Sequence, residues 1–234
     1  MRVVLFISLF VLLNNSVVGQ NRFWFSSGVK TTLFSEDLDA DVSMHARIFD
    51  NGRYDKIFPE LSFKYKVNKW FSPSFDYRYV FLQSRTSAER SHGHRVNFNL
   101  NTDFDYDRFD FQGRIRAQYR VTRLVQNSSS GYEPDFDTAV RFRARVKYDI
   151  KGSKIDPQID SEFYYNPTLG PFGRQFTKHR FGAGIDINLP NKHELSITYR
   201  YDFEFNVPNP VRAHILSLSH SWEYERDVYM GDGL

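Results

Sequence analysis

Polar and apolar residues alternate along most of this chain, and this alternation constrains the fold more than any other feature of the sequence. In the segment 95–106, apolar side chains stand at positions 96, 98, 100, 104 and 106, while the odd positions are polar or charged. Successive side chains of a β-strand point to opposite faces of the sheet. The period of two therefore predicts a strand with one apolar and one polar face.

Eleven segments share this pattern, and helical spacing is absent after residue 20. Because bacterial single-chain barrels normally have an even number of strands, an odd count needs an explanation. Either a strand remains unassigned within 122–133 or 223–230, or the first or last segment lies outside the wall. The predicted strands are 22–34, 41–49, 57–67, 70–81, 95–106, 109–121, 136–150, 155–166, 178–189, 193–205 and 214–224.

The connections between these segments alternate between short and long. Short turns on one rim and long loops on the other are typical of outer-membrane barrels. We expect the loop 122–135 to be the most mobile. Tight turns are predicted at 68–69, 107–108, 151–154 and 190–192, and longer polar loops at 82–92, 122–135, 166–177 and 206–213.

Alternation alone leaves open whether the apolar face points inward or outward, and three observations favour outward. The apolar rows persist for 11 to 15 residues, whereas soluble strands usually have about 5–6. Most segments carry too many large apolar groups to fit inside a small barrel. Aromatic residues such as Trp70, Tyr106 and Trp222 stand near strand ends, as in the girdles of membrane barrels.

The N-terminus has the features of a signal peptide. Arg2 supplies a positive charge, residues 3–13 are apolar apart from Ser8, and small residues precede Gln20. These features predict cleavage after Gly19, so that residues 1–19 form the signal peptide and residues 20–234 the exported domain. No later segment approaches the roughly 18 apolar residues of a membrane-spanning helix.

We therefore predict an all-β fold, a transmembrane antiparallel up-and-down β-barrel of about 10–12 strands in the outer membrane of a Gram-negative cell. The predicted function is that of a structural or narrow-pore barrel with a charge-lined lumen, embedded in outer-membrane lipid. Two alternatives stay open, an outer-membrane lipid hydrolase and a soluble periplasmic β-sandwich that binds a ligand. The oligomeric state is left open.

The polar rows predict the lining of the lumen. Segments 109–121 and 136–150 should pair and present a basic stripe, with an acidic stripe on each side. The charges either pair with one another and fill the lumen, or the basic groups attract small anionic solutes. The basic stripe comprises Arg114, Arg116, Arg120, Arg141, Arg143, Arg145 and Lys147, and the acidic stripes comprise Asp103, Asp105, Asp156, Asp160 and Glu162.

Nothing in the sequence predicts catalysis, a metal or a cofactor. The chain has no cysteine, and His92 and His94 lack an obvious third ligand. For a hydrolase, the nearest nucleophile and base are the serines 217, 219 and 221 and the histidines 214 and 220. Residue parity places His220 and these serines on opposite faces, which argues against that pairing. Basic and acidic residues are nearly balanced at 31 and 28, so we expect no nucleic-acid partner.

Short motifs give the chain a family resemblance. Tyr-Arg-Tyr occurs at 77–79 and at 199–201, a Trp stands early at position 24, and the second segment ends near Arg47. The turn at 65–70 reads Tyr-Lys-Val-Asn-Lys-Trp. With these motifs the chain resembles the outer-membrane family filed as domain of unknown function 2490, over essentially all of residues 20–234. The resemblance implies an uncharacterised barrel and adds no site.

Overall fold

The structure, a computed structural model, describes residues 19–33, 36–83, 90–124, 138–168 and 173–224, with the side chains of 121–124 left out. All elements among these residues are β-strands. None of the described residues forms a helix long and apolar enough to cross a membrane. The strands are β1 (Gln20–Thr32), β2 (Leu38–Phe49), β3 (Tyr54–Tyr65), β4 (Phe71–Gln83), β5 (Arg90–Tyr106), β6 (Phe109–Leu124), β7 (Ala139–Tyr148), β8 (Ile155–Asn166), β9 (Gln175–Leu189), β10 (His193–Glu204) and β11 (Arg212–Tyr224).

Each predicted segment corresponds to one strand, and β8 has the predicted bounds of 155–166. The largest difference is at β5, which begins at Arg90 and not at residue 95. Gly93 stands on the interior row of this extension, and a glycine adds no side chain to the alternating pattern. Residues 1–18, including the hydrophobic part of the predicted signal peptide, lie outside the described residues, as do 125–135 of the predicted mobile loop and 136–137 of the predicted strand 136–150.

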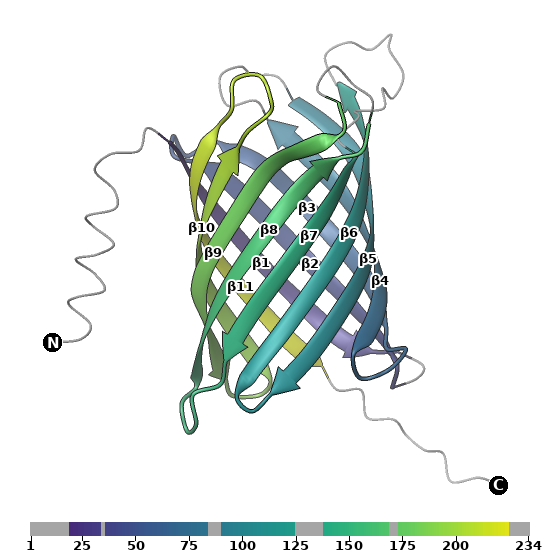
Figure 1. Cartoon of the computed structure of the whole chain (residues 1–234), viewed down its shortest axis with the longest axis vertical. Coiled ribbons are helices and arrows are strands. Elements are labelled where there is room, and N and C mark those ends of the chain that lie inside the picture. The colour runs from purple at the N-terminus through teal and green to yellow at the C-terminus, as the bar shows by residue number, and fades with distance from the viewer. Residues whose placement is uncertain (1–18, 34–35, 84–89, 125–137, 169–172, 225–234) are drawn as a thin grey trace, which may run out of the picture.

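All eleven strands belong to one closed barrel, in which each strand pairs with its neighbours in sequence (Figure 1). The ten sequential pairs are antiparallel, and β1 closes the wall against β11 in parallel, from Gln20 opposite Ala213 to Thr31 opposite Tyr224. The first and last segments both lie in the wall, so the alternative that one of them is outside it is wrong, and the count of eleven is odd but within the predicted 10–12. The other alternative, a further strand within 122–133 or 223–230, falls mostly outside the described residues. A parallel ladder pairs the backbone groups of both terminal strands, so eleven strands leave no open edge. The two-sheet sandwich is not formed.

The two rims of the barrel differ in the length of their connections, as predicted. The tight turns at 107–108 and 190–192 lie on the same rim, the lower one in Figure 1. Asp107, Asn191 and Lys192 have φ angles of 55°, 58° and 60°, a left-handed conformation that Asn and Asp tolerate better than most residues. The ends of β4, β6, β8 and β10, from which the longer connections start, reach the opposite rim, and so does the four-residue turn 50–53 between β2 and β3. We call these the turn rim and the loop rim.

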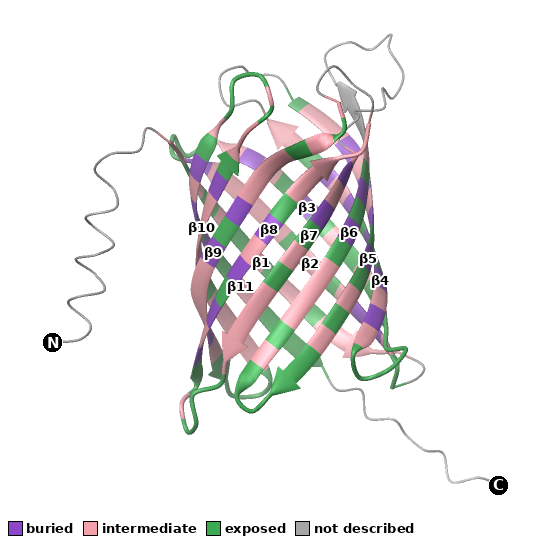
Figure 2. Ribbon diagram, viewed as in Figure 1, coloured by how far each residue is buried: buried purple, intermediate pink, exposed green. Residues whose placement is uncertain are grey.

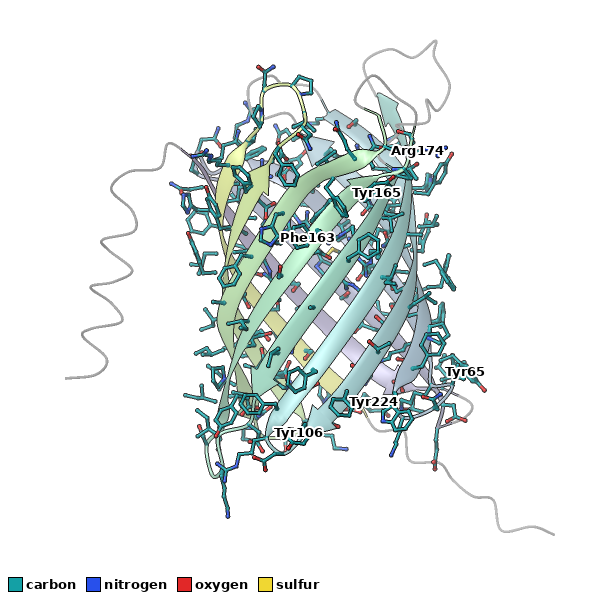
Figure 3. The ribbon with its side chains drawn as sticks, in the orientation of Figure 1. Tyr65, Tyr106, Phe163, Tyr165, Arg174 and Tyr224 are labelled. Atoms are coloured by element: carbon teal, nitrogen blue, oxygen red, sulfur yellow. The ribbon has the colours of Figure 1, made fainter. Side chains whose placement is uncertain are left out.

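The distribution of side chains is the reverse of that in a water-soluble protein, because polar residues are buried and large apolar residues are exposed. Among the described residues, twenty-one polar or charged ones are buried, against seven apolar ones. Thirty-six large apolar residues are exposed, among them Phe98, Phe142 and Ile197. Buried and exposed residues alternate along the strands (Figure 2), and aromatic side chains such as Phe163 project outward from the wall (Figure 3). The barrel interior is therefore polar, and the outer surface is apolar.

Cysteine cross-linking tests the eleven-strand closure, because the chain has no cysteine of its own. Ser26 of β1 is opposite Ser219 of β11, which is in turn opposite Ser196 of β10. Neighbouring strands lie about 4.8 Å apart, within the Cα separation of a disulfide. We expect Ser26→Cys with Ser219→Cys to form a disulfide on oxidation, measured by mobility on a non-reducing gel.

The matched control is Ser26→Cys with Ser196→Cys, which should stay reduced because β11 separates the two positions. Cross-linking of this control pair, without cross-linking of the first, would mean that β11 lies outside the wall and that ten strands close the barrel.

Candidate functional site

The seven residues of the predicted basic stripe stand on two adjacent strands, β6 and β7. Arg116 and Arg141 are buried and lie directly opposite one another. Arg114 and Arg143 also lie opposite one another. Arg120 is half-buried. Like charges that face each other across a ladder are destabilising, and burial makes them more so. The stripe therefore depends on carboxylates that reach it from other strands.

Glu162 of β8 is the main carboxylate partner of this stripe. Its side chain accepts hydrogen bonds from Arg114 at 2.9 Å and from Arg141 at 2.7 Å, and a nitrogen of Arg180 lies at 3.6 Å. The hydroxyl of Tyr164 donates to the same carboxylate at 3.0 Å. Glu162 is 2% exposed. Its single buried negative charge therefore interacts with three guanidinium groups from three strands.

The other predicted acids are placed differently. Asp160 lies 3.9 Å from Arg143, and Asp156 accepts a hydrogen bond from Asn188 at 2.8 Å. On the β5 side, Asp103 lies 3.5 Å from Lys64 of β3, and Asp105 is exposed near the turn rim. The strand β5 thus supplies no acid to the ion pairs described for the basic stripe.

Two carboxylates that the sequence analysis did not single out pair with further cations of the stripe. Asp76 of β4 accepts a hydrogen bond from Arg116 at 2.7 Å and others from Ser62 and Asn99. Asp186 of β9 is fully buried and accepts a hydrogen bond from Arg145 at 3.1 Å. Both residues alternate with apolar ones in the sequence, but only the closed barrel shows which cations they reach.

Two aromatic rings, those of Trp24 and Phe58, lie between arginines of the interior. The guanidinium carbon of Arg47 lies 4.0 Å from the ring centre of Trp24, and that of Arg180 lies 4.8 Å from it. Phe58, which is 1% exposed, is approached by Arg47 at 5.3 Å and by Arg78 at 5.1 Å. Such cation–π contacts gain strength when they are removed from water.

Two adjacent cavities, which share part of their walls, occupy the interior beside these rings. A central cavity of about 250 Å³ is lined by eight arginines and three carboxylates. A loop-side cavity of about 410 Å³, which includes Val207 and Pro208 of the loop rim in its wall, is lined by seven cationic residues and two carboxylates. Both cavities therefore have more positive than negative groups. Their shared wall residues are Trp24, Arg47, Arg141 and Arg180.

Histidines on the outer surface are hydrogen-bonded to hydroxyl groups of neighbouring strands. His220 Nδ1 lies 3.0 Å from the Ser27 hydroxyl, and His220 Nε2 lies 3.0 Å from His193 Nδ1. The hydroxyl group that contacts His220 thus belongs to β1. Ser217 and Ser219, on the same strand as His220, line the central cavity instead.

Further pairs of this kind occur elsewhere on the wall, Ser161 with His179 at 2.9 Å and Tyr77 with His94 at 2.7 Å. Their recurrence indicates that each hydroxyl satisfies an imidazole on an apolar surface, where an unpaired polar group is costly. No group of three His, Asp or Glu residues suited to a metal ion is found in the described part of the chain.

Comparison with known proteins places the sequence in a family context. The family model described as "Protein of unknown function (DUF2490)" matches residues 21–212. No curated protein matches the sequence. The motifs that carry the resemblance converge in the structure, since Trp24, Arg47, Arg78 and Arg200 all line the central cavity.

Removal of the Glu162 charge tests the role of this residue as an electrostatic hub. Glu162→Gln keeps the shape of the side chain and leaves three buried guanidinium groups with less negative charge. Loss of one partner from a buried ion pair costs about 3–5 kcal/mol, and we expect a loss of this size in the free energy of unfolding, measured by urea titration of the refolded protein.

Asp105→Asn is the matched control, because it removes one negative charge from an exposed position and should change stability by less than about 0.5 kcal/mol. Equal losses in the free energy of unfolding of the two variants would contradict this role of Glu162.

Proposed function

We propose that this chain, which belongs to the DUF2490 family of proteins of unknown function, is an integral outer-membrane β-barrel of the narrow-pore type. Its charge-lined lumen passes or holds small solutes, with a preference for anions, and the barrel has no catalytic role. The proposal rests above all on the inverted distribution of side chains.

Exposure of the apolar rows is the observation that carries the membrane assignment. Thirty-six large apolar side chains cover the outer surface, whereas apolar patches on soluble monomers rarely exceed a few hundred Å². Each such side chain gains about 1.5–3 kcal/mol when it is removed from water. Hydrocarbon around the barrel supplies that gain and leaves the charged interior enclosed. The predicted signal peptide 1–19 supports export to an outer membrane.

Strand length and aromatic placement support the same assignment. A strand of 12 residues, as in β2, β3, β8 and β10, rises about 3.3 Å per residue and spans about 28 Å when tilted near 45°. That height matches the apolar band of about 25 Å in outer-membrane barrels. Tyr65, Tyr106 and Tyr224 lie toward the turn rim, at the lower end of Figure 3, where amphipathic rings favour the boundary between lipid and water.

The interior residues support a passage that is narrow. Ion pairs centred on Glu162, Asp76 and Asp186 lie inside the barrel and narrow its lumen. Trp24, held between Arg47 and Arg180, stands at the junction of the two cavities. Solutes that enter from the loop rim therefore meet this ring before the central cavity. The excess of arginine along both cavities favours anions over cations.

An arginine placed on the outer surface distinguishes lipid from water around the barrel. Phe98 is at mid-strand in β5 and 52% exposed, and Tyr106 ends the same strand and is 68% exposed. In a bilayer, Phe98→Arg should lower the free energy of unfolding by about 2–4 kcal/mol, and Tyr106→Arg by about 0–1 kcal/mol. The measurement is urea unfolding in phosphatidylcholine vesicles.

Since both side chains are exposed, a barrel surrounded by water would tolerate both substitutions equally. Equal stabilities of the two variants, together with folding in buffer without detergent, would contradict the membrane assignment.

Planar-bilayer recording tests the narrow passage. We expect wild-type protein to give a small conductance that favours anions, because Trp24 and its arginines constrict the lumen. Trp24→Ala should raise the conductance, while Trp70→Ala on the turn rim should leave it unchanged. A cation-selective conductance, or one that Trp24→Ala does not alter, would contradict this assignment of the constriction.

A further inference from the structure

The loop-side cavity has cations that its own carboxylates do not neutralise. Its two carboxylates, Asp202 and Glu204, are already engaged. Arg180 donates two hydrogen bonds to Asp202 at 2.6 and 2.7 Å, and Lys178 lies 2.8 Å from Glu204. The remaining cations in the wall of this cavity are Arg22, Arg47, Lys56, Arg95 and Arg141.

Three of these cations, Arg22, Arg47 and Lys56, form no ion pair with any carboxylate that the structure describes. Arg22 donates to the amide oxygen of Gln20 at 2.8 Å, and Arg47 stacks on the ring of Trp24. Asp55 attracts both Arg47 and Lys56 from a distance. The three cations come from the adjacent strands β1, β2 and β3, so the surplus of positive charge is local.

Buried hydrogen-bond donors without a partner occur at several places in the interior, and three of them belong to wall residues of the loop-side cavity. Trp24 Nε1, Arg22 Nε and Arg141 Nε are buried atoms with no hydrogen-bond partner among the described residues. Arg141 is only 9% exposed, and all three residues line the loop-side cavity. Arginine and tryptophan side chains have donors and no acceptor. A group that pairs with the donors of this wall is therefore an acceptor, and the cations that lack a carboxylate partner favour a negatively charged one.

From this arrangement we propose that the loop-side cavity is a binding site for a small solute that carries a phosphate or diphosphate group. The inference rests on the proposed function in that the solute enters the lumen from the loop rim. Guanidinium groups bind phosphate through paired hydrogen bonds, and a diphosphate has enough negative charge for Arg22, Arg47 and Lys56 together. A cavity of about 410 Å³ accommodates a compact solute of this kind.

The position of the cavity argues for a soluble ligand and against a lipid headgroup. The lining side chains lie inside the closed wall, and the acyl chains of a lipid would have to cross that wall to place a headgroup there. Asp202 and Glu204 form their ion pairs with Arg180 and Lys178, and Asp202 attracts Arg22 only from a distance.

Fluorescence of Trp24 provides a direct readout, because the ring forms part of the cavity wall. The chain has three tryptophans, so Trp70→Phe with Trp222→Phe leaves Trp24 as the only one. The refolded protein is titrated in zwitterionic detergent with inorganic pyrophosphate at constant ionic strength. We expect a saturable change in Trp24 fluorescence, and neither chloride nor citrate should reproduce it at the same concentration.

Two lysines of β3 give a matched pair of variants. Lys56 and Lys64 are both on the interior row, but Lys56 lines the loop-side cavity and Lys64 pairs with Asp103 toward the turn rim. Lys56→Gln should weaken pyrophosphate binding roughly tenfold, the loss expected when one charged hydrogen bond is removed. Lys64→Gln should leave the binding constant within about twofold, since it removes the same charge outside the cavity.

Several results would overturn the site. One is a folded wild-type barrel whose Trp24 fluorescence shows no saturable response to pyrophosphate, or an equal response to chloride. Another is tighter binding of citrate than of pyrophosphate. A third is an equal loss of pyrophosphate affinity in Lys56→Gln and Lys64→Gln. A response to vesicles rich in phosphatidylglycerol in place of pyrophosphate would also overturn it. A chain that folds in buffer without detergent and still binds pyrophosphate would keep the site and overturn the membrane assignment.

Discussion

The structure depends on one constraint, the burial of charge inside a wall whose outer surface is apolar. Because a β-strand sends alternate side chains to opposite faces, most apolar residues on the outside have charged or polar neighbours on the inside. The interior must then compensate those charges among themselves or with bound groups, since an uncompensated buried charge is costly. Glu162 illustrates this with its three arginines.

This compensation has structural consequences that extend beyond adjacent strands. Arg114 of β6 reaches Glu162 of β8, and Arg145 of β7 reaches Asp186 of β9. Buried ion pairs add little net stability, because desolvation offsets the attraction between the charges. Their value here is positional, since each pair holds a guanidinium at a defined place along the interior. Aromatic rings such as Trp24 and Phe58 separate arginines that lack enough carboxylates.

Closure by an odd number of strands also shapes the site. A parallel β1–β11 pair brings the start of β1 beside the start of β11 at the loop rim, so Trp24 of β1 faces arginines contributed by β2, β9 and β10. The residues of the family motifs, far apart in the chain, therefore meet around one ring. A barrel closed between β1 and β10 would present a different set of side chains to Trp24.

The alternation in the sequence was sufficient to determine the eleven strands, the rims that carry short and long connections, and the separation of apolar from polar faces, because each of these follows from local spacing. The bounds of β8 were predicted to the residue, and those of β5 were not, because Gly93 interrupts the pattern. Only the tertiary structure decided how the wall closes, and with it which acid reaches which base. In the sequence, Asp76 and Asp186 cannot be distinguished from other carboxylates that alternate with apolar residues. Their ion pairs depend on distances across the barrel interior, and residue spacing along the chain does not determine those distances.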